Sequence, residues 1–186
     1  RCHSRRNVLD ETTLAGQRLT DGMACELIAP SIYHPDGQIL DEDFEYGSFA
    51  QSRMYHKQIR CTDCHDPHTA RTRYPGNSLC TTCHQHPAGK YDTAAHHHHK
   101  VGSTGSQCVD CHMPESHYME IDGRRDHSIR IPRPDLSVSL GTPNACTQCH
   151  LSDSKLPETR GTSPGRYQDW LAAARDGDDE VRAELE

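Results

Sequence analysis

The chain has 186 residues, of which only 33% are apolar, and its aromatic residues include two Phe and one Trp. This apolar share is well below that of a packed soluble domain, so the side chains alone predict a small core. The formal net charge of −7 argues against nucleic acid as a partner, and no apolar stretch is long enough to predict a membrane span.

Residues 1–55 show no strong periodicity. They carry turn signals at Asp21-Gly22 and Asp36-Gly37, and a short alternating segment at Gln38-Ile39-Leu40. His34 lies within the second turn, directly before Pro35, so its side chain is expected to project from the turn.

Residues 56–150 contain a repeated chemical signature, C-x-x-C-H. It occurs four times: Cys61-Cys64-His65, Cys80-Cys83-His84, Cys108-Cys111-His112 and Cys146-Cys149-His150. This pattern is the attachment signal for haem c, in which two thiols add to the vinyl groups of one porphyrin and the histidine binds the iron. The motifs start 19, 28 and 38 residues apart, so they are a repeated site and not a structural repeat. The alternative is a pair of zinc ribbons, which would leave the motif histidines unexplained.

Four covalently held porphyrins would supply the apolar body that the side chains lack. The stretches between the motifs are rich in Gly, Pro, Ser, Thr and Asp. We therefore predict a mainly irregular chain with short α-helices around each motif, packed on haem. The haem propionates would make the protein still more acidic.

The first three residues, Arg1-Cys2-His3, match the last three residues of the same motif. They predict a fifth haem, held through one thioether at Cys2 and ligated by His3. The alternative is a disulfide between Cys2 and Cys25, which an oxidising exterior would permit.

Fifteen histidines are present, and only four methionines. The motifs use His65, His84, His112 and His150 as proximal ligands, and the surplus is large enough to give every iron a second imidazole. We therefore predict low-potential haems with two histidine ligands each. Such an iron has no open position for a substrate, which favours electron transfer over catalysis.

Candidate distal ligands are spread along the chain. His34 and His68 are two of them. Because Pro67 stiffens the chain directly after the proximal ligand, His68 is expected to bind the iron of a neighbouring haem. Adjacent side chains of an extended segment point to opposite sides, so two of the run 96–99 can serve two haems, and we assign His97 and His98.

His127 is the remaining candidate, in a segment that Pro132 and Pro134 predict to be extended. Four nearby arginines, Arg124, Arg125, Arg130 and Arg133, are available to pair with propionates. The alternative for each arginine is a solvated surface position.

The last part of the chain has a different character. Residues 151–165 predict a linker, with Pro157, Gly161, Pro164 and Gly165. Residues 166–186 predict a C-terminal helix pair of the kind that begins a helical repeat array.

Several segments together resemble a family of multihaem c-type cytochromes. They are the stretches 33–39, 46–49, 61–68, 96–99, 108–114, 123–137 and 140–150. Members of this family often continue into tetratricopeptide repeats and are distantly similar to pentahaem nitrite reductases and octahaem cytochromes. The resemblance implies a multihaem cytochrome domain over residues 1–150 that begins inside a haem motif, and a chain that ends inside the first repeat helices.

The resemblance also implies haems with two histidine ligands, in stacked and perpendicular pairs. It gives His34, His68, two residues of the run 96–99, and His127 as distal ligands. The related nitrite reductases use a C-x-x-C-K site, which this sequence lacks. That departure weakens a nitrite-reductase interpretation.

Three functions stay open at this stage. The first is an electron carrier with closely spaced haems, whose partners are other redox proteins or cytochromes. In its extreme form the carrier is a subunit of an extracellular conductive filament, in which further copies of the chain are also partners. The second is a multihaem reductase of a small nitrogen or sulfur oxyanion. The third is a docking module that haem only stabilises. Because thioether attachment takes place outside the cytoplasm, we expect an exported, periplasmic or extracellular protein whose leader lies upstream or has been removed.

Overall fold

The computed structural model describes residues 3–14, 16–26, 28–41, 45–85, 90–118 and 121–150. Within these ranges the chain forms short helices, joined by loops, and two antiparallel two-stranded sheets. No helix in these ranges is both long and apolar enough to cross a bilayer. The predicted linker 151–165 and the helix pair 166–186 lie outside them, as does Cys2.

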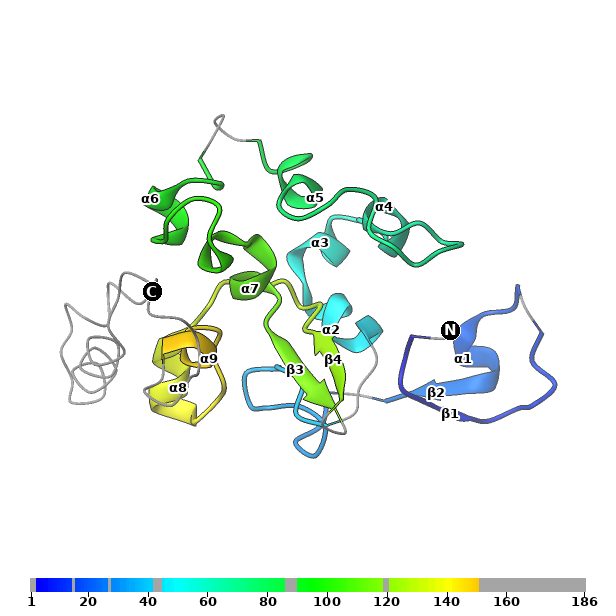
Figure 1. Ribbon diagram of the computed structural model, residues 1–186. Helices are drawn as coiled ribbons and strands as arrows, with labels where there is room; N and C mark the ends of the chain where they lie inside the picture. Colours follow the sequence, from blue (N-terminus) through cyan, green and yellow to red (C-terminus); the bar gives the residue numbers. More distant parts are fainter. Residues whose placement is uncertain are drawn as a thin grey trace.

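A small N-terminal unit lies at one end of the molecule (Figure 1). It consists of β1 (Arg6–Val8), α1 (Leu19–Gly22) and β2 (Met23–Cys25), with Arg6 opposite Cys25 in the sheet. The backbone N–H groups of Leu9 and Asp10 both donate to the carbonyl of Gly22, at 2.8 and 3.0 Å, and these bonds tie the end of β1 to α1. Cys25 is a free, half-buried thiol.

The central segment holds most of the buried apolar side chains. Ile32, Tyr33 and Phe49 are each at most 9% exposed, and Phe49 belongs to α2 (Glu45–Gln51). The turn that the sequence predicts around His34 is present, because Tyr33 pairs with Ile39 across it. Ser52 caps the following helix, α3 (Arg53–His56), by accepting a hydrogen bond from the Tyr55 N–H at 3.0 Å.

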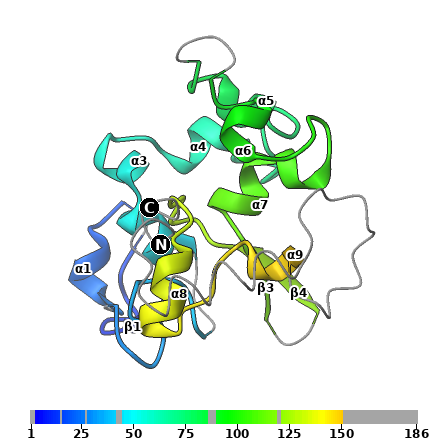
Figure 2. The ribbon, with the colours of Figure 1, turned by 90° about the vertical axis from the view of Figure 1, so that its left-hand side faces the viewer.

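The motif region follows as a row of short helices. They are α4 (Cys61–Cys64), α5 (Ser78–Thr81), α6 (Ala94–His97), the 3₁₀ helix η1 (Thr104–Ser106) and α7 (Cys108–His112). Figures 1 and 2 show α4, α5 and α6 together on one side of α7.

The chain then crosses to the other side of α7. The hairpin of β3 (Glu115–Tyr118) and β4 (Asp122–Arg125) leads to α8 (Pro134–Leu140) and α9 (Thr147–His150). Gln38 donates through Nε2 to the carbonyl of Pro143 at 2.5 Å, which joins the central turn to the segment before the fourth motif.

Large apolar side chains remain exposed among the described residues. Val8, Ile121 and Ile131 are 58%, 89% and 60% exposed, whereas the most buried polar residues include Ser48 and Ser52 at 0% and 1%. In the part of the chain that the structure describes, protein side chains alone therefore form a very small core.

Candidate haem sites

Each C-x-x-C-H motif forms one helical turn. The N–H of His65, His84 and His150 donates to the carbonyl of the first cysteine of its motif, at 2.8, 2.9 and 2.9 Å, and the third motif lies within α7. Positions i, i+3 and i+4 of a helix share one face. This turn therefore presents both thiols and the imidazole of a motif on the same side, as attachment of one porphyrin requires.

The orientation of two proximal histidines is set by main-chain carbonyls. His65 is hydrogen-bonded through Nδ1 to the carbonyl of Ala70 at 2.9 Å, and His112 through Nδ1 to that of Arg130 at 2.8 Å. A carbonyl accepts, so Nδ1 carries the proton and Nε2 is left as the lone-pair nitrogen for a metal. His127 is held the same way, with Nδ1 2.9 Å from the carbonyl of Arg125.

Within the described residues, three of the four proximal rings lie beside a second imidazole. The ring centroids of His65 and His127 are 6.3 Å apart, those of His112 and His96 6.0 Å, and those of His150 and His99 5.7 Å. Because metal–imidazole bonds are about 2 Å long, two imidazoles that ligate one metal from opposite faces have centroids roughly 6 Å apart. The three pairs fit that spacing.

The second motif differs from the others. His84 is exposed, and its ring lies 6.0 Å from that of Tyr91, edge to face. Tyr91 in turn lies 5.2 Å from His96, the imidazole that faces the third motif. Tyr91 therefore stands between the ligand sets of the second and third motifs. His86 lies outside the described residues.

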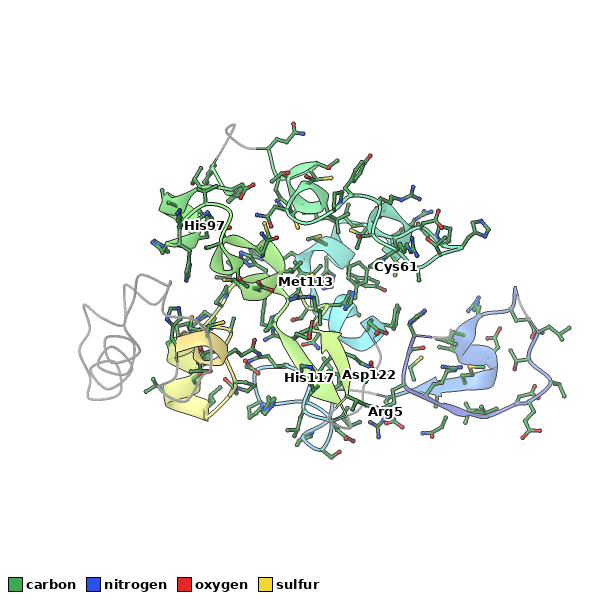
Figure 3. The ribbon with its side chains drawn as sticks, viewed as in Figure 1. Arg5, Cys61, His97, Met113, His117 and Asp122 are labelled. Atoms are coloured by element: carbon green, nitrogen blue, oxygen red, sulfur yellow. The ribbon has the colours of Figure 1, made fainter. Side chains whose placement is uncertain are left out.

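The run 96–99 is not extended, contrary to the expectation from sequence. α6 ends at His97, and His98 adopts the left-handed conformation, with φ 57°. This geometry, and not the alternation of a strand, brings His96 and His99 to proximal histidines. The assignment of His97 and His98 as distal ligands stays a prediction, because neither ring lies beside a proximal histidine. The Nε2 atom of His97 is buried and has no hydrogen-bond partner. Figure 3 shows His97 and Cys61 far apart along the motif row.

The electrostatic environment of His96 suits a metal ligand. Burial, followed by the nearby His112 and His97, lowers the pKa of His96. A lowered pKa favours the neutral imidazole, which is the form that binds metals.

In the described ranges, no second imidazole lies beside the other predicted ligands. His34 is half-buried in its turn, and His68 is exposed, with its N–H bonded to Asp66 Oδ1 at 3.0 Å. His3 is exposed, and its Nδ1 lies 3.2 Å from Oε2 of Glu45. Their roles stay predictions, and Cys2 lies outside the described residues.

Thiols of successive motifs influence one another. Burial, then Asp63 and Cys83, raises the pKa of Cys64, which links the first two motifs. Burial, then Cys146, raises the pKa of Cys111 to about 11, which links the last two. Between the second and third motifs, a hydrogen bond from Cys80 lowers the pKa of Cys108 to about 7. Thiols of successive motifs therefore lie close enough to shift one another's pKa.

The four arginines expected to pair with propionates are paired with carboxylates of the chain. Arg124 lies 2.7 Å from Asp122, Arg125 3.0 Å from Asp110, Arg130 3.6 Å from Asp36 and Arg133 2.6 Å from Asp135. A propionate would have to compete with these partners or share them. The sequence indicated the cations but not their acidic partners, of which Asp122 and Asp135 are local and Asp36 and Asp110 come from a turn and a helix elsewhere.

The residues present fit haem c. The eight motif cysteines form no disulfide, and each motif places its thiols and imidazole on one face. Among the described residues no group of three or more His, Cys, Asp or Glu side chains could share one metal ion, so each facing imidazole pair is a two-ligand arrangement. Haem c, when bound, supplies a one-electron couple at its iron.

The comparisons with known proteins agree with this chemistry. The chain is 28% identical over 153 residues to the cytochrome c-type protein NrfB of Escherichia coli, across 66% of this chain and 78% of that protein. The similarity supports a c-type cytochrome that binds haem c. No family model matches the chain, and no solved structure matches it.

Proposed function

We propose that the chain is a multihaem c-type cytochrome that carries electrons and has no catalytic iron. The thiols of the four motifs hold four haems, and His65, His112 and His150 are proximal ligands opposite His127, His96 and His99. The observation that carries this proposal is the spacing of the three imidazole pairs, 5.7 to 6.3 Å between centroids.

The residues around these pairs support a carrier role. Carbonyl groups orient the imidazoles of His65, His112 and His127 before any metal binds, so little rearrangement is needed there when the iron changes charge. The mutual influence of thiols of successive motifs on their pKa values supports an arrangement in which neighbouring sites are close enough to exchange electrons. The three sites with two imidazoles offer no open coordination position, and such sites can pass charge from one to the next.

Absorption and EPR spectra of the holoprotein test the proposal. We expect low-spin iron at the three sites with facing imidazoles, and a pyridine haemochrome count of at least four haems per chain. The substitutions His127→Ala, His96→Ala and His99→Ala should each convert one haem to a high-spin form that binds cyanide. A matched control is His117→Ala, because His117 is exposed on β3 and faces no proximal ring. High-spin iron in the control alone would contradict the assignment.

A second candidate function, reduction of a small oxyanion, is favoured by the second motif. Its proximal His84 contacts Tyr91 where the other motifs have an imidazole. Lys90 lies over the Tyr91 ring, with Nζ 5.1 Å from the centroid, and adds a positive charge beside this site. Cyanide binding by one haem of the unmodified protein, together with turnover of nitrite or sulfite, would support this function over the carrier.

The narrower proposals concern assembly and export. His3 and His68 are exposed, so an iron in another copy of the chain can reach them, and a head-to-tail contact would extend the row of sites into a filament. A fifth haem at Cys2 and His3 would lie at that contact. His3→Ala should then abolish polymers seen by electron microscopy; unchanged polymers would refute this part. We also propose a periplasmic or extracellular location and other redox proteins as partners.

A further inference from the structure

Asn77 joins the second and third motifs. Its main-chain carbonyl accepts hydrogen bonds from Cys80 N–H at 3.0 Å and Thr81 N–H at 2.9 Å, which start the turn of the second motif. Its side-chain Oδ1 accepts from the N–H of Cys108 at 2.9 Å, the first residue of the third motif. One half-buried residue therefore holds the first cysteine of both motifs.

The side-chain amide nitrogen of Asn77 also binds the segments that precede the third motif. Nδ2 donates to the carbonyl of Ser106 at 2.8 Å and to Asp92 Oδ1 at 2.9 Å. Ser106 is 3% exposed and ends η1, and its Oγ donates to the carbonyl of Ser103 at 2.7 Å. The segment that receives Asn77 is therefore itself held in place.

The two cysteines that Asn77 holds lie near each other. Each thiol shifts the pKa of the other, upward for Cys80 and down to about 7 for Cys108, and Tyr91 lies between His84 and His96 of the same two sites. Each sulfur is the point where its prosthetic group would be tied. A residue that fixes the distance between these two sulfur atoms therefore also fixes the separation of the two prosthetic groups that would be attached to them.

The geometry points to Asn77 as a positioning residue that sets the redox interaction between the haems of the second and third motifs. This inference rests on the proposed function, because it requires haem at both motifs. It assigns no ligand or catalytic role to Asn77, which acts through Cys80 and Cys108.

Haem-methyl NMR signals followed through a redox titration of the holoprotein test the inference, because they report the interaction between each two haems separately. For Asn77→Ala we expect a weakened interaction between the second and third haems. The interactions of the first with the second haem and of the third with the fourth should stay as in the native protein. If Asn77 contributes to stability alone, the substitution should change the interactions of all three haem pairs, or of none of them.

Two further substitutions keep the test informative if Asn77→Ala folds poorly. Asn77→Asp keeps an acceptor for the Cys108 N–H but places a carboxylate oxygen beside Asp92 and the Ser106 carbonyl, so it should also weaken the interaction. Asp92→Ala removes one arm only and leaves the bonds to Cys108 and Ser106, so it should leave the interaction unchanged. Equal effects of Asp92→Ala and Asn77→Ala would overturn the inference.

Asn144 provides a matched control within the chain. Its Oδ1 accepts from the N–H of Cys146 at 3.0 Å, as Asn77 does for Cys108, but its Nδ2 donates to Ser137 Oγ at 2.6 Å, outside any motif. Asn144→Ala should leave the interaction between the second and third haems unchanged. A haem count below four would refute the proposed function instead, while native interactions in Asn77→Ala with full haem content would refute only this inference.

Discussion

At the residue scale, Arg130 joins parts of the molecule that are distant in sequence. Its guanidinium lies 3.6 Å from Asp36 and 3.7 Å from Asp126, whose side chains are 4% and 8% exposed. It also donates to Ser128 Oγ at 2.7 Å and to the carbonyl of Asp36 at 3.0 Å. Its own carbonyl accepts from His112. The same residue therefore balances two buried carboxylates and orients a proximal ligand.

We expect Arg130→Met to destabilise the protein by about 3 kcal/mol, because it leaves two buried carboxylates without their cation. Guanidinium denaturation of the holoprotein, followed by far-UV circular dichroism, measures the change. The control is Arg133→Met, whose pair with Asp135 is more exposed, at 43% for the arginine side chain. It should cost less than about 1 kcal/mol. Equal losses in the two variants would contradict the role given to Arg130.

At the element scale, the turn of α6 decides which histidines of the run 96–99 face a motif. Ala94 and Ala95 begin the helix, and the left-handed residue His98 ends it. The helix thereby stops after His97, and His99 lies beside the proximal ligand of the fourth motif while His96 lies beside that of the third. Ala94 and Ala95 are strong helix formers, and this signal favours helical over strand spacing in the run.

His98→Gly tests this arrangement. Glycine adopts the left-handed conformation without the penalty of about 1–2 kcal/mol that other residues meet, although it loses more entropy on folding. We expect stability within about 1 kcal/mol of the native protein and unchanged low-spin spectra. If His98 is instead a distal ligand, as the sequence assignment has it, the variant will show a high-spin haem.

At the scale of the whole molecule, few side chains are available to form a core. Ile32, Tyr33, Phe49 and Ala145 are the apolar residues buried in the described part of the chain. A core of this size is small compared with the conformational entropy that folding must offset, and we propose that covalent and iron bonds to haem help to hold the fold.

We therefore expect the protein to be unfolded when haem is not attached. Production without the maturation machinery, or with alanine at all eight motif cysteines, should give a chain with poorly dispersed NMR signals and no cooperative thermal transition. The holoprotein is the reference. A cooperative transition in the haem-free chain would show that side-chain packing alone supports the fold.

The sequence by itself determined the local chemistry. Four C-x-x-C-H motifs predict four attachment sites, because the residues that react with one porphyrin are neighbours along a single turn. It also predicted the turn at His34, because Pro35, Asp36 and Gly37 act locally. Its low apolar content predicted the small core.

Only the tertiary structure decided which imidazoles face one another. His127 lies more than sixty residues beyond His65 along the chain, and the two come together only because the helices and the hairpin between them fold back. The pairing of the arginines with Asp36, Asp110 and Asp126, and the junction at Asn77, were equally absent from the motif pattern. Contacts between residues far apart in sequence depend on how intervening segments fold back, and motif spacing carries no information about that.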